Sequence, residues 1–104
     1  TMAPHCNDAE KYKIVDVMTQ KFRELFEKKT RIAGKLISEI LTINGVRFIL
    51  ENGSWGLIRA SSNKPSLVIV TESFQSADEM KAIFKFIDNL LETTGKVGKY
   101  DQKI

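Results

Sequence analysis

The stretch "INGVRFILENGSWGLIRASSNKPSLVIVTES", Ile43 to Ser73, decides the fold because its apolar runs alternate with turn residues. Each run has the length and the β-branched or aromatic content of a strand. Together with the run just before them, the predicted strands are Ile40–Ile43, Val46–Leu50, Trp55–Arg59 and Leu67–Thr71. Asn44-Gly45 suits a tight type I′ turn, and Glu51-Asn52-Gly53 suits a second reversal. The first three strands are therefore expected to form an antiparallel meander.

Amphipathic helices are predicted on both sides of these strands. The first has the form of an Asx cap over Asn7–Glu10 and runs to about Lys28. Its apolar residues recur at spacings of three and four: Ile14, Val15, Met18, Phe22, Leu25 and Phe26. The second begins with a Ser-x-x-Glu capping box at Ser76 and ends near Thr94-Gly95. Its apolar residues are Met80, Ile83, Phe84, Ile87, Leu90 and Leu91.

This order of elements predicts an α+β fold of two layers, in which a four-stranded, mainly antiparallel sheet carries both helices on one face. Residues 1–104 are expected to form a single domain, with a mobile Lys-rich tail at 96–104. Alternation along the third strand puts Trp55, Leu57 and Arg59 on one face. We expect Trp55 and Leu57 to belong to the core and Arg59 to leave the sheet at its rim.

Charge and composition exclude few classes of function. The net charge of +3 and the pI near 9.1 permit an anionic ligand, but they fall short of a dedicated nucleic-acid binder. No apolar run approaches the length that spans a bilayer, and no signal-peptide core is visible, so we expect no membrane partner. A single cysteine, Cys6, excludes an internal disulfide and favours a cytoplasmic location.

The residues of a self-sufficient enzyme are not evident in the sequence. His5 and Cys6 are adjacent, but they lack the ligand number of a metal site and the third group of a catalytic dyad. Asp78 and Glu79 are explained by the helix cap and by the helix dipole. The glycines do not form a nucleotide-binding pattern. We therefore expect the domain alone to be inactive and to hold no cofactor.

The loop Arg59–Pro65 is the remaining candidate for a binding site, because it is longer and more polar than a chain reversal requires. Its residues suit a phosphate group: a guanidinium for paired charge-assisted hydrogen bonds, and short neutral donors beside backbone N–H groups. The candidate ligands are Arg59, Ser61, Ser62, Asn63 and Lys64. A plain solvated loop is the alternative, since serine, asparagine and proline are also ordinary turn residues.

The block Ile43–Ser73 resembles the C-terminal domain of the α-D-phosphohexomutase superfamily, in particular bacterial phosphomannomutase/phosphoglucomutase enzymes. Members show D-G-V-x-V, then G-W-x-L-V-R, then the loop R-[AP]-S-[NG]-T-x-P, and this chain has matching segments at 44–48, 54–59 and 59–65. The opening "PHCNDAEKYKIVDVM" is similar to the Asp-x-x-Lys-aromatic-x-Ile-Val helix that begins the domain. The similarity covers most of this chain, but only the last quarter of a complete enzyme.

The resemblance implies a TATA-binding-protein-like fold and a loop that binds the substrate phosphate remote from the reacting centre. Arg59 and Ser61 match the family loop directly. Ser62 replaces Asn or Gly, Asn63 replaces Thr, and Lys64 departs from Thr or Glu, so its contact with phosphate is left open. The complete enzymes interconvert hexose 1-phosphates and 6-phosphates through a bisphosphate, and their phosphoserine, their Mg²⁺ and their sugar-recognition residues lie in other domains.

The expected partners are thus a hexose phosphate and the other domains of the same enzyme, and no nucleic acid. The alternative function is a stand-alone basic module that binds nucleic acid or a phosphorylated partner. Preference among mannose, glucose and glucosamine phosphate does not follow from this chain, and neither does its oligomeric state or its existence as a natural fragment.

Overall fold

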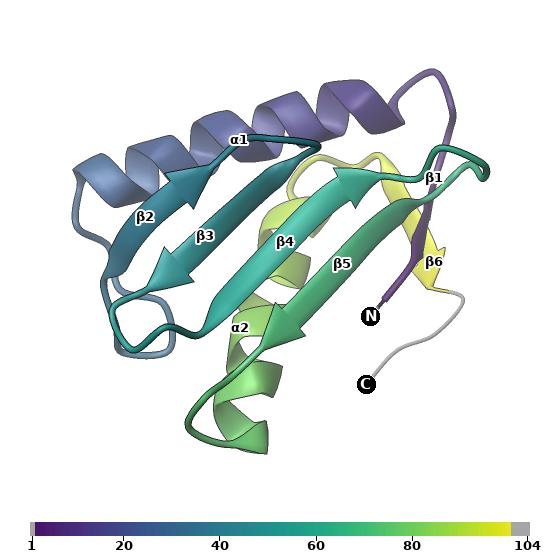
Figure 1. Ribbon diagram of the computed structural model, residues 1–104. Helices are drawn as coiled ribbons and strands as arrows, with labels where there is room; N and C mark the ends of the chain where they lie inside the picture. Colours follow the sequence, from purple (N-terminus) through teal and green to yellow (C-terminus); the bar gives the residue numbers. More distant parts are fainter. Residues whose placement is uncertain (1, 101–104) are drawn as a thin grey trace.

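The computed structural model describes residues 2–100, which form an α+β domain of two layers (Figure 1). A four-stranded antiparallel sheet of order β2-β3-β4-β5 lies in front of α1 and α2, so both helices cover the same sheet face, as predicted. In chain order the elements are β1 (Pro4–Cys6), α1 (Lys11–Glu27), β2 (Ile37–Leu41), β3 (Val46–Leu50), β4 (Trp55–Ala60), β5 (Leu67–Glu72), α2 (Ala77–Glu92) and β6 (Val97–Tyr100).

The sheet is the meander that the turn residues predict. Val46 of β3 lies opposite Ile58 of β4, and Ala60 of β4 lies opposite Leu67 of β5. The strand β2 differs from its prediction, since it ends at Leu41 and leaves Ile43 in the hairpin loop, 85% exposed. The apolar side chain of Ile43 favoured a strand, but the positive φ angles of the next two residues already belong to the turn.

The core lies between the sheet and the helices, and its side chains come from alternate strand positions. Ile58 and Phe48 are fully buried, and the Phe48 ring stacks on that of Phe22 from α1 with centroids 4.4 Å apart. Trp55 and Leu57 share a face, as predicted, but their expected place in the core is wrong. They lie half-buried on the face that the helices leave open, because the helices cover the side of Gly56 instead.

The two helices begin differently. Ser76 caps α2 as predicted, since its hydroxyl oxygen accepts the backbone N–H of Glu79 at 3.0 Å. The predicted cap at Asn7 is wrong, because α1 begins at Lys11 without a side-chain cap. The Asn7 side chain instead accepts the N–H of Ala9 at 2.9 Å, and the Asn7 carbonyl accepts the N–H of Lys11 at 2.9 Å, so residues 7–10 form a turn that leads directly into the helix. Neither helix within residues 2–100 is long and apolar enough to cross a membrane.

Strand β6 occupies part of the segment for which the sequence predicted a mobile tail. Within 96–104, residues Val97–Tyr100 pair antiparallel with β1, with Cys6 opposite Val97, while 101–104 lie outside the described residues. The same N-terminal segment also meets β5, because Met2 and Ile69 exchange backbone hydrogen bonds of 2.6 and 2.7 Å. Both ends of the described chain therefore lie beside the β5 edge of the sheet (Figure 1).

Candidate functional site

Arg59 stands at the rim of the sheet, where the end of β4 meets the β2–β3 hairpin. The register that pairs Val46 with Ile58 brings Asn44 and Gly45 next to it. Gly45 has a φ of +113°, and a Cβ there would lie 2.3 Å from the Ile58 carbonyl oxygen and 2.7 Å from the Arg59 Cβ. Only glycine permits this approach, so the hairpin packs directly against the base of the arginine.

A hollow of about 540 Å³ opens at this rim. Arg59, Ala60 and Ser62 contribute to it from the end of β4 and the following loop. The other lining residues are Tyr12, Val15, Asp16, Asn44 and Gly45. A smaller hollow of about 330 Å³ shares Asn44 and Arg59 with the first and continues over the open sheet face. The exposed Arg59 side chain thus lies where two recesses meet.

The loop after Arg59 is curled by its own hydrogen bonds. The Ser61 hydroxyl oxygen accepts the backbone N–H groups of Asn63 at 3.4 Å and Lys64 at 3.3 Å. Ser62 donates its hydroxyl to the Asn63 side-chain oxygen at 2.8 Å, and the Ser61 N–H donates to the Ser66 carbonyl at 2.9 Å. The loop is therefore a closed turn in which one serine holds two neighbouring N–H groups together.

Two residues of the N-terminal segment donate hydrogen bonds to backbone carbonyl groups of this loop. The buried Lys11 ammonium donates to the Lys64 carbonyl oxygen at 3.0 Å and forms an ion pair with Asp8 at 2.9 Å. The backbone N–H of Cys6 donates to the Pro65 carbonyl oxygen at 2.8 Å. The loop is thereby attached to the beginning of α1 and to β1, which are distant in sequence.

The structure brings only some of the predicted ligands to the hollow. Arg59 and Ser62 line it, whereas Ser61 acts within the turn and Asn63 accepts from Ser62. The Lys64 side chain is exposed and absent from the lining, although its carbonyl carries the Lys11 contact. Sequence reasoning missed the contribution of Tyr12, Asp16 and the hairpin residues. The predicted meander was the available signal for the hairpin, because it already places Asn44-Gly45 beside the end of β4.

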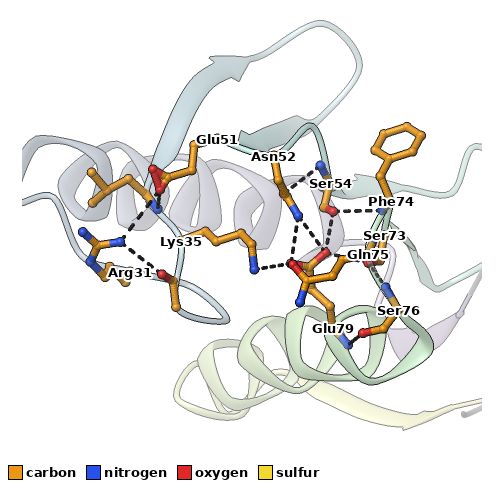
Figure 2. Close-up of polar contacts among 12 residues, drawn as sticks. Arg31, Lys35, Glu51, Asn52, Ser54, Ser73, Phe74, Gln75, Ser76 and Glu79 are labelled. Carbon is orange, nitrogen blue, oxygen red and sulfur yellow. Dashed lines mark hydrogen bonds and ion pairs between the residues drawn. The ribbon is translucent and has the colours of Figure 1, made fainter.

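A second polar centre surrounds Glu79 at the opposite end of β4 (Figure 2). The Lys35 ammonium pairs with this buried carboxylate at 2.7 Å. Ser54 and Ser73 each donate a hydroxyl at 2.5 Å, and the Asn52 amide donates at 3.0 and 3.2 Å. Burial alone would raise the pKa of Glu79, but the hydrogen bonds from Lys35, Ser54, Ser73 and Asn52 outweigh it and lower the pKa to about 2.

The Glu79 centre is structural. Its carboxylate oxygens are fully engaged by donors from the β3–β4 loop, the β5–α2 loop and the segment before β2. The same centre fixes the loop backbone, because the Ser54 hydroxyl oxygen accepts the N–H of Phe74 at 3.0 Å. The sequence attributed Glu79 to the helix cap and the helix dipole; its backbone N–H does take part in the cap, but its side chain holds this buried polar centre together as well. The rim at Arg59 remains the candidate binding site.

Comparison with known proteins shows the family of the domain. The family described as phosphoglucomutase/phosphomannomutase, C-terminal domain, matches residues 6–90, which include α1, the strands β2 to β5, the rim loop Arg59–Pro65 and most of α2. The chain belongs to this family of phosphohexomutase C-terminal domains. The resemblance that the rim loop and the preceding hairpin suggested is thus confirmed.

Two curated relatives are similar to this phosphohexomutase domain. A probable phosphoglucosamine mutase from Methanosphaera stadtmanae is 31% identical over 90 residues, which cover 83% of this chain and 18% of the relative. A phosphopentomutase from Thermococcus kodakarensis is 37% identical over 68 residues, which cover 65% of this chain and 14% of the relative. The chain spans less than a fifth of the length of either mutase.

Proposed function

We propose that this domain binds the phosphate group of a sugar phosphate at the rim loop Arg59–Pro65. In this proposal it is the C-terminal part of a phosphomannomutase/phosphoglucomutase, an isomerase that interconverts hexose 1-phosphate and 6-phosphate through a bisphosphate. The observation that carries the proposal is the meeting of Arg59 and Ser62 in one hollow, beside a turn whose N–H groups Ser61 gathers. Membership of the phosphohexomutase family supports it.

The residues at the rim have complementary roles toward a phosphate dianion. Arg59 supplies charge and paired N–H donors, and Ser62 supplies a hydroxyl. The hydrogen bonds from Asn63 and Lys64 N–H to Ser61 are long, at 3.4 and 3.3 Å, so these two weakly bonded groups are the proposed backbone donors to an arriving oxyanion. Lys64 adds positive charge nearby. A site that recognises phosphate rather than sugar accepts either end of a bisphosphate, which the isomerisation requires.

The chemical step is assigned to other domains of the enzyme. A bound Mg²⁺ would supply charge neutralisation at the transferring phosphoryl group. Residues 2–100 bring together no three His, Cys, Asp or Glu side chains that suit a metal ion, so they do not fit this role. The domain's own contribution is to hold the unreactive phosphate in place, and the isolated chain is proposed to be inactive. A cytoplasmic location belongs to the same proposal.

Replacement of Arg59 tests the proposal. In the complete enzyme, Arg59→Ala should raise KM about 10- to 100-fold, because each tenfold loss corresponds to about 1.4 kcal/mol of binding free energy. In the 104-residue chain, the same change should abolish saturable binding of inorganic phosphate in an NMR titration. Arg31→Ala is the matched control, since it removes the same charge near Glu51, away from the rim. Equal phosphate affinities in the two variants would contradict the proposal.

One observation from the structure favours the second candidate function, a module that binds nucleic acid. Trp55 lies on the open sheet face, where an aromatic side chain can stack on bases. However, the Arg47 guanidinium already covers its ring at 4.4 Å from the centroid, and Phe48 is buried in the core. Titration with a single-stranded oligonucleotide decides between the two: tight binding that weakens steeply with salt would favour the module.

A further inference from the structure

Lys11 has surroundings that differ from those of a surface lysine. It is the first residue of α1, and its side chain is only 6% exposed. Burial of an ammonium group is costly unless it is paired and hydrogen-bonded. Here the partners are Asp8, three residues earlier, and the Lys64 carbonyl oxygen, 53 residues later in the chain. The long-range partner belongs to the proposed phosphate-binding loop.

The Lys64 carbonyl group helps to fix the conformation of the loop, because its oxygen accepts two hydrogen bonds. It accepts the Lys11 ammonium at 3.0 Å and the backbone N–H of Ser66 at 2.8 Å, so it has two donors. The N–H of the same residue, Lys64, points to the Ser61 hydroxyl oxygen. The peptide groups around Lys64 are thus held from the helix on one side and from inside the turn on the other.

We infer that Lys11 is a positioning residue for phosphate binding, which holds the loop in the conformation that presents its donors to the anion. This inference rests on the proposed function. The physical reason is preorganisation: a loop that is already curled loses less conformational entropy when the ligand arrives. Lys11 does not line the hollow, so its effect passes through the Lys64 carbonyl rather than through contact with phosphate.

The coupling between lysine and ligand must act in both directions. If the Lys11–Lys64 hydrogen bond favours the phosphate-binding conformation, bound phosphate must stabilise that hydrogen bond by the same factor. A lysine that only fills space in the fold would show no such response. This reciprocity gives a measurement that a purely structural role would not change.

Substitution with a matched control tests the inference. In the 104-residue chain titrated with inorganic phosphate at constant ionic strength, Lys11→Met should weaken binding about fivefold or more. Lys13→Met removes the same charge from an exposed position on the same helix and should change the affinity less than about twofold. Equal affinities in the Lys11 and Lys13 variants would overturn the inference, even where Arg59→Ala abolishes binding as expected.

If Lys11→Met fails to fold, the inference is tested on the unsubstituted protein. Exchange of the Lys11 ammonium protons with water, followed by NMR, should slow on saturation with phosphate, and an unchanged rate would overturn the inference. The result also separates the inference from the proposed function. If the unsubstituted chain shows no saturable binding of phosphate, the proposed function itself is wrong.

Discussion

At the scale of single residues, Glu79 shows how hydrogen bonds and an ion pair stabilise a buried carboxylate. Its carboxylate receives hydrogen bonds from Lys35, Ser54, Ser73 and Asn52, all of which favour the ionised form (Figure 2). A carboxyl group with a pKa near 2 in the folded state, against an ordinary value near 4.5, binds its proton more weakly than in the unfolded chain. Its contribution to stability is therefore complete above pH 4.5 and is lost as the pH falls toward 2.

Glu79→Gln tests this role of the carboxylate. The variant should lose about 2 to 4 kcal/mol of unfolding free energy at pH 7, because Lys35 is left without its charged partner. The difference from the unsubstituted protein should shrink as the pH falls from about 4.5 to 2, where the native carboxylate also becomes protonated. Chemical denaturation at a series of pH values measures it. Asp78→Asn, on the exposed first turn of the same helix, is the control and should cost less than about 1 kcal/mol.

At the scale of elements, the close packing of β4 against β3 and α2 depends on Gly56. This glycine is buried on the helix-covered face, opposite Phe48. A Cβ at Gly56 would lie 2.6 Å from the Phe48 Cζ and 3.0 Å from the Ile87 Cδ1. The missing side chain leaves room for the Phe48 ring, which in turn stacks on Phe22 from α1.

Gly56→Ala should therefore destabilise the domain by about 1 to 3 kcal/mol, as expected for overpacking in a core. Gly98→Ala in β6 is the matched control, because its Cβ would meet His5 at an ordinary 3.5 Å. The control should change the unfolding free energy by less than about 0.5 kcal/mol. Thermal or urea unfolding of the two variants measures the difference, and equal stabilities would refute this account of the β3–β4 contact.

The elements were largely predictable because their signals are local. Turn residues and alternation located β3, β4 and β5 to within a residue, and Ser76 located the start of α2. Alternation also grouped Trp55 with Leu57, but it does not say which face the helices cover, so their burial was misjudged. The rim loop was chosen as a candidate binding site from its composition, and that choice stays a prediction. Its attachment to Lys11 was not predicted, because a contact across 53 residues has no local signal.

At the scale of the whole molecule, the two ends of the described chain close one side of the domain. Strands β1 and β6 form a two-stranded ladder, and β1 also contacts β5. Cys6 lies at this junction and is fully buried. Burial, together with the nearby Glu10, raises the pKa of the Cys6 thiol, although Lys11 partly offsets this. The thiol is thus both inaccessible and protonated, which makes it unreactive.

Removal of β6 should expose this junction. A chain that ends at Lys96 is expected to react with a thiol reagent at least about tenfold faster than the 104-residue chain, because Cys6 loses its neighbour Val97. The reaction rate under native conditions measures the change, with the denatured protein as the upper limit. Phe74→Ala, at an exposed loop position, should leave the rate unchanged. Equal rates in the 104-residue and shortened chains would show that β6 does not protect the thiol.

The two polar centres stand at opposite ends of a single strand, β4. Across its six residues they are separated by about 17 Å, so each can be altered without touching the other. Ser54, beside the first residue of β4, is committed to holding the fold through Glu79, whereas Arg59 near its other end is exposed. Under the proposed function, substitution of an exposed rim residue such as Arg59 can therefore change the affinity for phosphate at little cost to the stability of the fold.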